Sequence, residues 1–218
     1  MKLLAVDTCL DACSAALWAD GGVAASLSEP MSRGHQERLA PQVAELMQGA
    51  GCAFSELDRI AVTVGPGSFT GLRVGLAFAK GLALALDVPC VGVGALEALA
   101  WSGGAKGFAA ACLDAKRGQV YLQIFIDGKA AMAPDVLPVE IAAARLAELW
   151  NGAPATLVGS GAPLLAGVLA NAAILTPAAA DPAAVAEIAA AARAPFPIPR
   201  PLYLRPPDAK LPGGVTPP

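Results

Sequence analysis

Apolar and polar residues alternate in three short segments at the start of the chain, which predicts strands over 3–6, 14–18 and 23–28. Asp20-Gly21-Gly22 lies between the second and third of these and predicts a hairpin turn. The period then changes to that of a helix. The rest of the first half is predicted as a helix over 35–49, a strand over 59–64, a helix over 68–86, a strand over 89–93 and a short helix from Ala95. The order of elements is therefore βββαβαβα.

The second half repeats this order in a degraded form. Its predicted elements are strands over 108–113 and 120–126, a weak strand over 130–132, a helix over 139–150, a strand over 156–158, a helix over 163–170, a strand over 173–175 and a helix over 182–193. Two such halves that face each other across a cleft form the α/β, actin-like ATPase architecture (ASKHA, ribonuclease-H-like). We expect a first lobe at 1–104, a second, degenerate lobe at 105–200 and a proline-rich strap or tail at 201–218. Within this tail, residues 201–205 are expected to pack on the body and 213–218 to be mobile.

Composition narrows the class of protein. The 218 residues carry a formal charge of −3 and have a pI near 5.1, which argues against autonomous binding of nucleic acid. Hydrophobic residues make up 56% and the mean hydropathy is +0.56, so apolar surface beyond a monomer's own core is expected. The five cysteines are scattered, and Asp7 comes too early for a signal-peptide core. Prolines divide the longest uncharged stretch, 151–180. We therefore expect a cytoplasmic protein with reduced thiols and no membrane span.

A glycine-rich run, Gly65-Pro66-Gly67-Ser68-Phe69-Thr70-Gly71, joins a predicted strand to the longest predicted helix. Such a turn exposes backbone N–H groups at the positive end of a helix, as an anion site requires. A phosphate loop has the pattern G-x-x-x-x-G-K-[ST], whereas here Leu72 follows Gly71 and the next lysine is Lys80. The run can shape the turn or bind a ligand, but it is not expected to transfer phosphate.

Three further turns are candidate, vestigial nucleotide sites, because actin-like proteins hold nucleotide at turns after strands. Asp7 and Thr8 follow the first strand, and Asp114 closes the first strand of the second half. Gly159 and Gly161 stand between a strand and a helix. The structural alternatives are an Asx turn at Asp7, a charged hairpin tip at Asp114 and an ordinary short glycine turn. The residues alone leave these alternatives open.

Several motifs together resemble one family. They are Leu4-Ala5-Val6-Asp7-Thr8, His35-Gln36-Glu37-Arg38-Leu39-Ala40-Pro41, the run Gly65–Gly71 with Leu72-Arg73-Val74-Gly75, Asp114-Ala115-Lys116-Arg117 and Pro201-Leu202-Tyr203-Leu204-Arg205. This set is similar to TsaB proteins, and the resemblance covers almost the whole chain. The family is the non-catalytic subunit of the bacterial machinery that installs threonylcarbamoyl on the tRNA adenosine next to the anticodon. The resemblance implies a TsaD-type transferase and a TsaE-type ATPase as partners, with tRNA contacted only indirectly.

Catalytic arrangements are sparse in this sequence. Transferase relatives carry a metal-binding H-x-x-x-H after the strand that follows the glycine helix, and the resemblance places Ala95 and Leu99 at those two ligand positions. His35 is the only histidine and has no nucleophile motif beside it. We therefore expect no catalytic residue and no metal, and nucleotide only within a complex. The alternative hypothesis is a nucleotide-dependent phosphotransferase that uses Asp7 and Asp114.

The predicted helix over 68–86 is apolar around most of its circumference, with only Arg73 and Lys80 as a polar stripe. Ala77, Gly81 and Ala85 are spaced so that another backbone could approach closely. The alternatives are a central core helix, or a helix with one face on the sheet and the other on a partner. We expect a partner interface, with TsaD or with a second copy when the partner is absent, from this helix and the helix over 35–49. Its predicted residues are His35, Leu39, Val43, Met47, Thr70, Arg73, Val74, Ala77 and Gly81.

Overall fold

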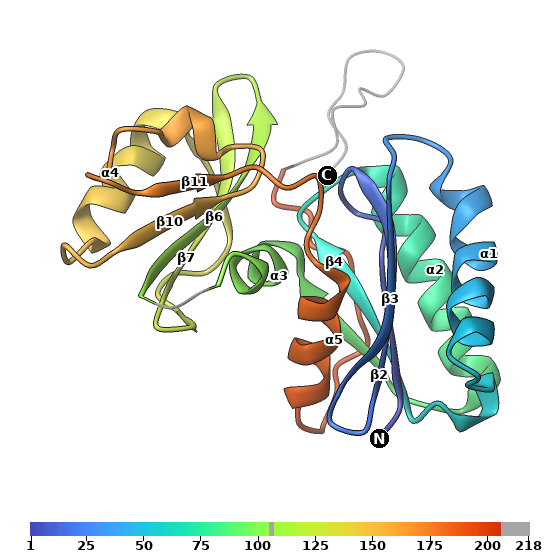
Figure 1. Ribbon diagram of the computed structural model, residues 1–218. Coiled ribbons are helices and arrows are strands. Elements are labelled where there is room, and N and C mark those ends of the chain that lie inside the picture. The colour runs from blue at the N-terminus through green and yellow to red at the C-terminus, as the bar shows by residue number, and fades with distance from the viewer. Residues whose placement is uncertain (105–106, 206–218) are drawn as a thin grey trace, which may run out of the picture.

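The computed structural model describes residues 1–104 and 107–205, and Figure 1 shows two lobes that are each built on one β-sheet. β1 is the central strand of the first sheet; it pairs antiparallel with β2 and parallel with β4, with Leu4 opposite Leu17 and Ile60. The first sheet has the order β3(Gly22–Pro30), β2(Ala12–Ala19), β1(Leu3–Asp7), β4(Arg59–Gly65), β5(Cys90–Gly94).

The second sheet repeats this topology. Its central strand, β6, again has an antiparallel neighbour on one side, β7, and a parallel neighbour on the other, β10. The order is β11(Ala173–Leu175), β10(Ala155–Val158), β6(Phe108–Lys116), β7(Gln119–Ile126), β8(Lys129–Ala130), with β9(Asp135–Pro138) also paired to β7. The two halves of the chain therefore form the same strand arrangement, as the duplicated element order predicts.

Helices cover both faces of the first sheet. α1(His35–Gly49) and α2(Phe69–Leu86) lie on its outer face, and α5(Pro182–Ala191), from the end of the chain, packs on its inner face. α3(Ala95–Ser102) instead packs on β6 of the second sheet, whose other face carries α4(Val139–Leu149). α3 and α5 contact each other between the sheets (Figure 1). The last helix of each half therefore packs on the sheet of the other half, and one apolar core contains residues of both lobes.

Most predicted elements agree with the structure to within two residues, but two predictions were wrong. The helix over 163–170 is only a 3-10 turn, η2(Ala162–Leu165). Gly167 has φ +83°, a left-handed conformation that ends a helix. The strand β9 was missed because its four residues follow Pro134, end with Pro138 and show no clear alternation. The lobe limits of 1–104 and 105–200 stay a proposal, since α5 shows that position in the chain does not by itself assign an element to a lobe.

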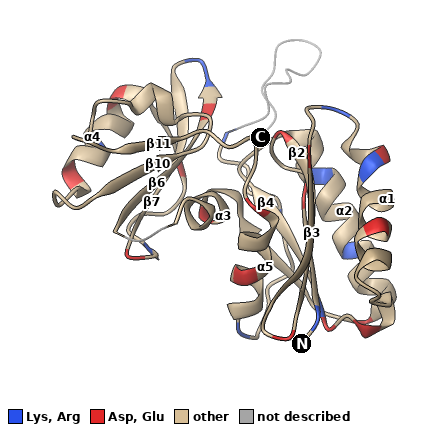
Figure 2. Ribbon diagram, in the orientation of Figure 1, with Lys and Arg blue, Asp and Glu red and all other residues tan. Residues whose placement is uncertain are grey.

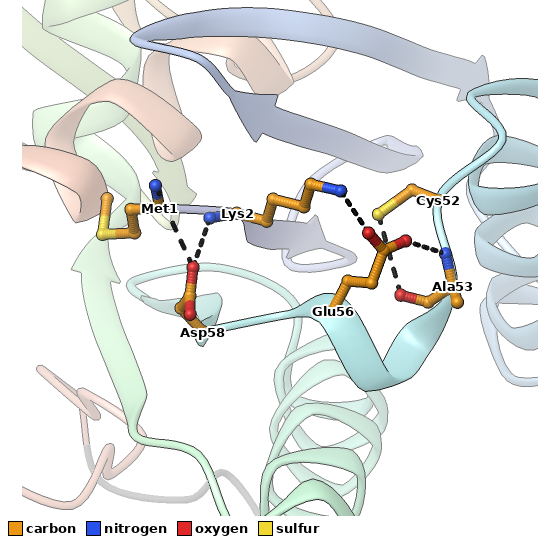
Figure 3. Close-up of polar contacts among 6 residues, drawn as sticks. All are labelled: Met1, Lys2, Cys52, Ala53, Glu56 and Asp58. Atoms are coloured by element: carbon orange, nitrogen blue, oxygen red, sulfur yellow. Dashed lines mark hydrogen bonds and ion pairs between the residues drawn. The ribbon is translucent and has the colours of Figure 1, made fainter.

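A polar network ties the base of the first lobe together (Figure 3). The Lys2 ammonium contacts Glu56 Oε1 at 2.6 Å, and the backbone N–H of Lys2 donates to Asp58 Oδ2 at 2.6 Å. Glu56 Oε2 accepts from the N–H of Ala53 at 2.8 Å. These bonds hold the short turn η1(Phe54–Glu56) against β1. Burial raises the pKa of the neighbouring Cys52 thiol, so this network is structural and contains no activated nucleophile.

Residues 201–205 run along the body as a strap. The N–H of Leu202 donates to the carbonyl of Val64 in β4 at 2.7 Å. Arg205 reaches the second lobe, where it donates to the carbonyl of Ala115 at 2.8 Å and to Gln119 Oε1. The strap therefore bridges the two lobes. Residues 206–218, and with them the expectation for 213–218, lie outside the described residues.

Candidate functional site

The glycine-rich run packs directly on the first turn of the chain. A Cβ atom on Gly71 would lie 1.9 Å from the Thr8 carbonyl oxygen, and one on Gly67 would lie 2.2 Å from the Cys9 carbonyl oxygen. The N–H of Ser68 donates to that same Cys9 oxygen at 2.7 Å. Because any side chain at these two positions would collide with backbone, glycine is required for the close approach itself.

The start of α2 is also satisfied within the chain. The Ser68 hydroxyl caps the helix by accepting from the N–H of Gly71 at 3.3 Å, and the Thr8 hydroxyl donates to the Gly71 carbonyl at 2.8 Å. Thr8 Oγ1 also fills the space beside Gly75, where an added Cβ would meet it at 2.6 Å. These contacts support the interpretation of this run as a packing joint, in place of a phosphate site.

The two candidate aspartates make the same turn in the two lobes. Asp7 Oδ1 accepts from the N–H of Cys9 at 2.9 Å and from the Thr63 hydroxyl at 2.6 Å. Asp114 Oδ1 accepts from the N–H of Lys116 at 2.7 Å, and its Oδ2 contacts the Lys116 ammonium at 2.7 Å. The hydrogen bonds from Lys116 lower the pKa of Asp114. In each lobe an Asx turn thus joins the central strand to its antiparallel neighbour.

The glycine turn of the second lobe repeats the packing of the first. A Cβ atom on Gly159 would lie 2.3 Å from the Cys112 carbonyl oxygen, and the N–H of Gly161 donates to that oxygen at 3.0 Å. The Ser160 hydroxyl accepts from the N–H of Asp114 at 3.1 Å. Gly159 and Gly161 therefore hold η2 against the end of β6, which is a structural role equivalent to that of Gly67 and Gly71.

A cleft of about 650 Å³ separates the two Asx turns, but its walls do not favour a polyphosphate. Its charged lining residues are Asp11, Asp114 and Lys116, and the last two neutralise each other. Asp7 does not line the cleft, because its side chain is only 1% exposed. Burial raises the pKa of the Cys9 thiol at the cleft wall well above its usual value. The cleft thus lacks both a concentration of positive charge and a reactive thiolate among its described residues.

Four of the residues predicted for a partner interface lie inside the first lobe. The exposed fractions are 8% for His35 and 1% for each of Leu39, Val43 and Met47. All four come from the face of α1 that packs on the sheet, where the leucine, valine and methionine join the core with Leu4 and Val62. A monomer cannot bury these side chains and also offer them to a partner. These four residues are therefore corrected to core positions, and an interface formed by the other five, all on α2, stays a prediction.

The outer face of α2 is apolar and exposed. Thr70, Arg73, Ala77 and Gly81 are exposed and Val74 is half-buried, while the buried residues of α2 face the sheet. Leu84 lies on the same face and is 85% exposed, the largest value among the large apolar side chains of the described residues. It was missed in the sequence, although its position two turns after Ala77 could have identified it. We refer to Thr70, Arg73, Val74, Ala77, Gly81 and Leu84 as the α2 face.

A groove of about 460 Å³ separates the α2 face from α1. Its walls include Gln36 and Ala40 from α1 and Phe69, Val74 and Phe78 from α2. By length and composition alone, α2 could also cross a membrane, a test that core helices pass as well. Here six residues of α2 are buried against its own lobe, so that only its other side is available for a contact.

The C-terminal strap borders the α2 face. The Tyr203 ring lies on Phe69, with 5.4 Å between the ring centroids, and the Arg73 guanidinium lies 3.7 Å above the same phenylalanine ring. Arg73 Nε also contacts the Tyr203 hydroxyl at 3.4 Å. These three side chains hold the strap at the start of α2 and restrict the motion of Arg73.

Ala95 and Leu99, which the resemblance places at the two metal-ligand positions, are fully buried in α3. Neither side chain has an atom that could coordinate a metal. Within residues 1–104 and 107–205, no three His, Cys, Asp or Glu side chains are grouped closely enough to hold a metal ion.

Comparison with known proteins identifies the family. The family model described as "TsaD: tRNA N6-adenosine threonylcarbamoyltransferase" matches residues 19–152. The chain belongs to the TsaD family. Curated relatives include the Escherichia coli (strain K12) "tRNA threonylcarbamoyladenosine biosynthesis protein TsaB", 40% identical over 124 residues, or 56% of this chain and 53% of that protein. The Bacillus subtilis protein of the same name is 37% identical over 126 residues, or 57% of this chain and 55% of that protein. The predicted resemblance to TsaB is thereby confirmed, and the matched region spans about half the length of these relatives.

Solved structures agree with the predicted fold. A Pseudomonas aeruginosa protein described as uncharacterized, with similarity to the peptidase YeaZ, is 32% identical, with a TM-score of 0.81 over 94% of this chain and 99% of that one. The ethanolamine utilization protein EutJ of Carboxydothermus hydrogenoformans is 13% identical, with a TM-score of 0.54 over 86% of this chain and 89% of that one, and shows the fold alone. The predicted α/β, two-lobed, actin-like architecture is confirmed.

Proposed function

We propose that this chain is a supporting subunit in the biosynthesis of threonylcarbamoyladenosine in tRNA, and that it acts by binding a TsaD-type transferase. One observation carries the proposal: a long helix of the first lobe presents an exposed apolar face, with Leu84 at 85% exposure. Exposed apolar faces of this kind mark protein interaction sites. The names of the TsaB relatives supply the pathway.

The subunit has a supporting role in this proposal because its own chemistry is limited. The resemblance places Ala95 and Leu99 at the metal-ligand positions of a metal-dependent transferase, and neither can bind a metal. The Asp7 and Asp114 carboxylates accept hydrogen bonds within their own turns. Catalysis, nucleotide and tRNA contacts are then assigned to partners, which include a TsaE-type ATPase. The net charge of −3 agrees with an indirect role toward tRNA. We further propose a cytoplasmic location and a homodimer when the transferase is absent.

The α2 face suits a helical partner. Ala77 and Gly81 are exposed and lie one turn apart, and no atom lies within 4 Å of the position that a Cβ on Gly81 would take. Small side chains permit two helix backbones to approach closely, and Leu84 and Phe78 add apolar area at the end and edge of the same surface. The proposed contact is a packed helix pair between the two proteins.

The first prediction tests this contact with Ala77→Glu. The fold should persist, because Ala77 is exposed and Arg73 and Lys80 stand four and three residues away, where they can pair with the new carboxylate. Binding to the transferase should fall by about 100-fold or more, since a charge and extra volume enter a close-packed contact. Sedimentation and titration calorimetry with the purified TsaD-type protein of the same organism measure the loss. Ala147→Glu, at an exposed alanine of α4, is the matched control.

Reconstitution extends this test to function. Purified transferase and ATPase are supplied with tRNA and threonylcarbamoyl-adenylate, with and without this chain, and modified adenosine is measured. We expect strong stimulation by the unaltered chain and by Ala147→Glu, but not by Ala77→Glu. Equal product formation without the chain would contradict the proposal. Micromolar ATP binding with hydrolysis by the isolated chain, removed by Asp7→Asn, would instead favour the phosphotransferase alternative.

A further inference from the structure

The α2 face carries positive charge and no negative charge. Arg73 and Lys80 are the only charged residues between Phe69 and Leu86. Figure 2 shows blue and no red along α2, whereas α1 beside it carries both colours. Residues seven positions apart lie on the same side of a helix, two turns or about 10 Å apart. The two cations therefore form a stripe along one border of the α2 face.

No carboxylate of the described residues neutralises either cation. Arg73 contacts only the Phe69 ring and the Tyr203 hydroxyl, and Lys80 makes no hydrogen bond or ion pair within residues 1–104 and 107–205. Arg38 on the neighbouring helix shows the contrast, since it binds both Glu29 and Glu45 at 2.6 to 2.9 Å. The chain as a whole is acidic, with a net charge of −3. The border of the α2 face therefore carries two positive charges that no carboxylate of the described residues neutralises.

We propose that Arg73 and Lys80 determine which partner the α2 face accepts. This inference rests on the proposed function. The occupant is an apolar helix of a different protein that carries carboxylates about seven residues apart, so that one faces Arg73 and the other faces Lys80. Complementary charges at the border of an interface accelerate binding and reject wrong partners. A second copy of this chain is such a wrong partner.

Symmetry explains why self-association is disfavoured. Two copies that pair through the same face do so about a two-fold axis, so each surface meets itself. Arg73 and Lys80 of both copies would then border one interface, and four positive charges would repel one another. The apolar residues still attract, which leaves self-association weak instead of absent. A partner with acidic residues makes the same apolar contact, and its carboxylates also attract Arg73 and Lys80.

The structure also prepares Arg73 for this role. Its guanidinium already lies on Phe69 and next to Tyr203 of the strap, so that little side-chain freedom remains to be lost on binding. The terminal nitrogens of Arg73 make no hydrogen bond with the described residues. A carboxylate can accept from both of them at once, which a lysine at this position could not offer.

The double variant Arg73→Gln/Lys80→Gln of the full chain tests the inference because the two associations should change in opposite directions. We expect binding to the TsaD-type protein to weaken by about 100-fold and self-association to strengthen by about tenfold. Titration calorimetry measures the first and sedimentation equilibrium the second. The control variant Lys129→Gln/Arg193→Gln removes the same amount of charge at exposed positions outside the α2 face. Its transferase binding and its self-association should each stay within about twofold of the unaltered chain.

Salt provides an independent measurement on the unaltered chain. Between about 50 and 500 mM NaCl, binding to the transferase should weaken and self-association should strengthen, because screening removes attraction from one and repulsion from the other. Equal transferase binding by the Gln pair and the unaltered chain, or a shift of both associations in the same direction, would overturn the inference and leave the proposed function standing. Absence of any transferase binding by the unaltered chain would overturn both.

Discussion

The two lobes share one strand topology, but they differ in the segment that follows the strand paired parallel to the central strand. In the first lobe, β4 leads through the glycine run into α2, an 18-residue helix. In the second lobe, β10 leads through Gly159 and Gly161 into η2, a turn of 4 residues. Both joints pack glycines on the end of a central strand, and both lobes carry an Asx turn there. The duplicated scaffold is therefore retained in both halves, but at this position only the first half has a helix long enough to pack on its sheet and expose a second face.

The largest expected effect distinguishes the two glycine joints. Gly71→Ala places a Cβ 1.9 Å from the Thr8 carbonyl oxygen, whereas Gly161→Ala places one 2.9 Å from the carbonyl carbon of Leu113. We expect Gly71→Ala to cost more than about 4 kcal/mol, or roughly 10 °C in Tm, because backbone must move. Gly161→Ala should cost clearly less. Thermal and urea unfolding measure both costs, and equal losses of stability would show that the two glycines are equally important for folding.

An intermediate effect of opposite sign is expected on the α2 face. Gly81→Ala adds a Cβ where no atom lies within 4 Å, so the isolated chain should gain about 0.5–1 kcal/mol of stability from the better helix former. The same methyl group would obstruct a closely packed partner helix, so transferase binding should weaken by about tenfold. Unfolding and titration calorimetry on the same sample check the two halves of this prediction. A gain in stability with unchanged binding would remove Gly81 from the interface.

The smallest expected effect concerns the exposed carboxylates of the two lobes. Hydrogen bonds from Arg38 lower the pKa of Glu45 in the first lobe, and hydrogen bonds from Lys116 lower that of Asp114 in the second. A lowered folded-state pKa stabilises the protein above the unfolded-state pKa, and this contribution is lost as the pH falls through the folded-state value.

Arg38→Ala and Lys116→Ala should therefore each lower Tm slightly at pH 7, since exposed pairs contribute little. The difference from the unaltered chain should shrink as the pH falls below the unfolded-state pKa values of about 4, and it should disappear only when the pH lies below the lowered folded-state values. Tm measured from pH 7 into the acid range checks both variants. A difference that persists after both carboxylates are protonated would show that the arginine or lysine acts by packing, without its ion pair.

Much of the fold could be predicted because its elements have clear local signals. The bounds of α1 were predicted to the residue, from the apolar spacing of Leu39, Val43, Leu46 and Met47. The order of elements along the second half was predicted from its repetition of the first half. Prediction failed at η2, where Gly167 interrupts a segment that is otherwise apolar enough for a helix, and at β9, which is too short to show alternation. A feature that depends on one residue, or on very few, is harder to predict from the sequence than one that repeats with a regular apolar period.

The candidate site was predicted less completely. The small-residue spacing of Ala77 and Gly81 identified the exposed side of α2, but Leu39, Val43 and Met47 were assigned to the same surface and lie in the core. A helical period shows that a helix has an apolar side without showing what covers that side. For α1 the cover is its own sheet. The Arg73, Phe69 and Tyr203 contact could not be found at all, since 130 residues separate Arg73 from Tyr203 in the chain.

The sequence by itself determined the elements, their duplicated order and the family, because local periodicity and short motifs depend on neighbours in the chain. It also determined that α2 has more apolar surface than one contact needs, and that Arg73 and Lys80 are its only charges. Tertiary structure decided which apolar faces remain uncovered, that α3 and α5 pack on each other's sheets, and that the strap borders the α2 face. Those outcomes depend on contacts between distant segments, which are selected by the packing of the whole chain and leave no local trace in the sequence.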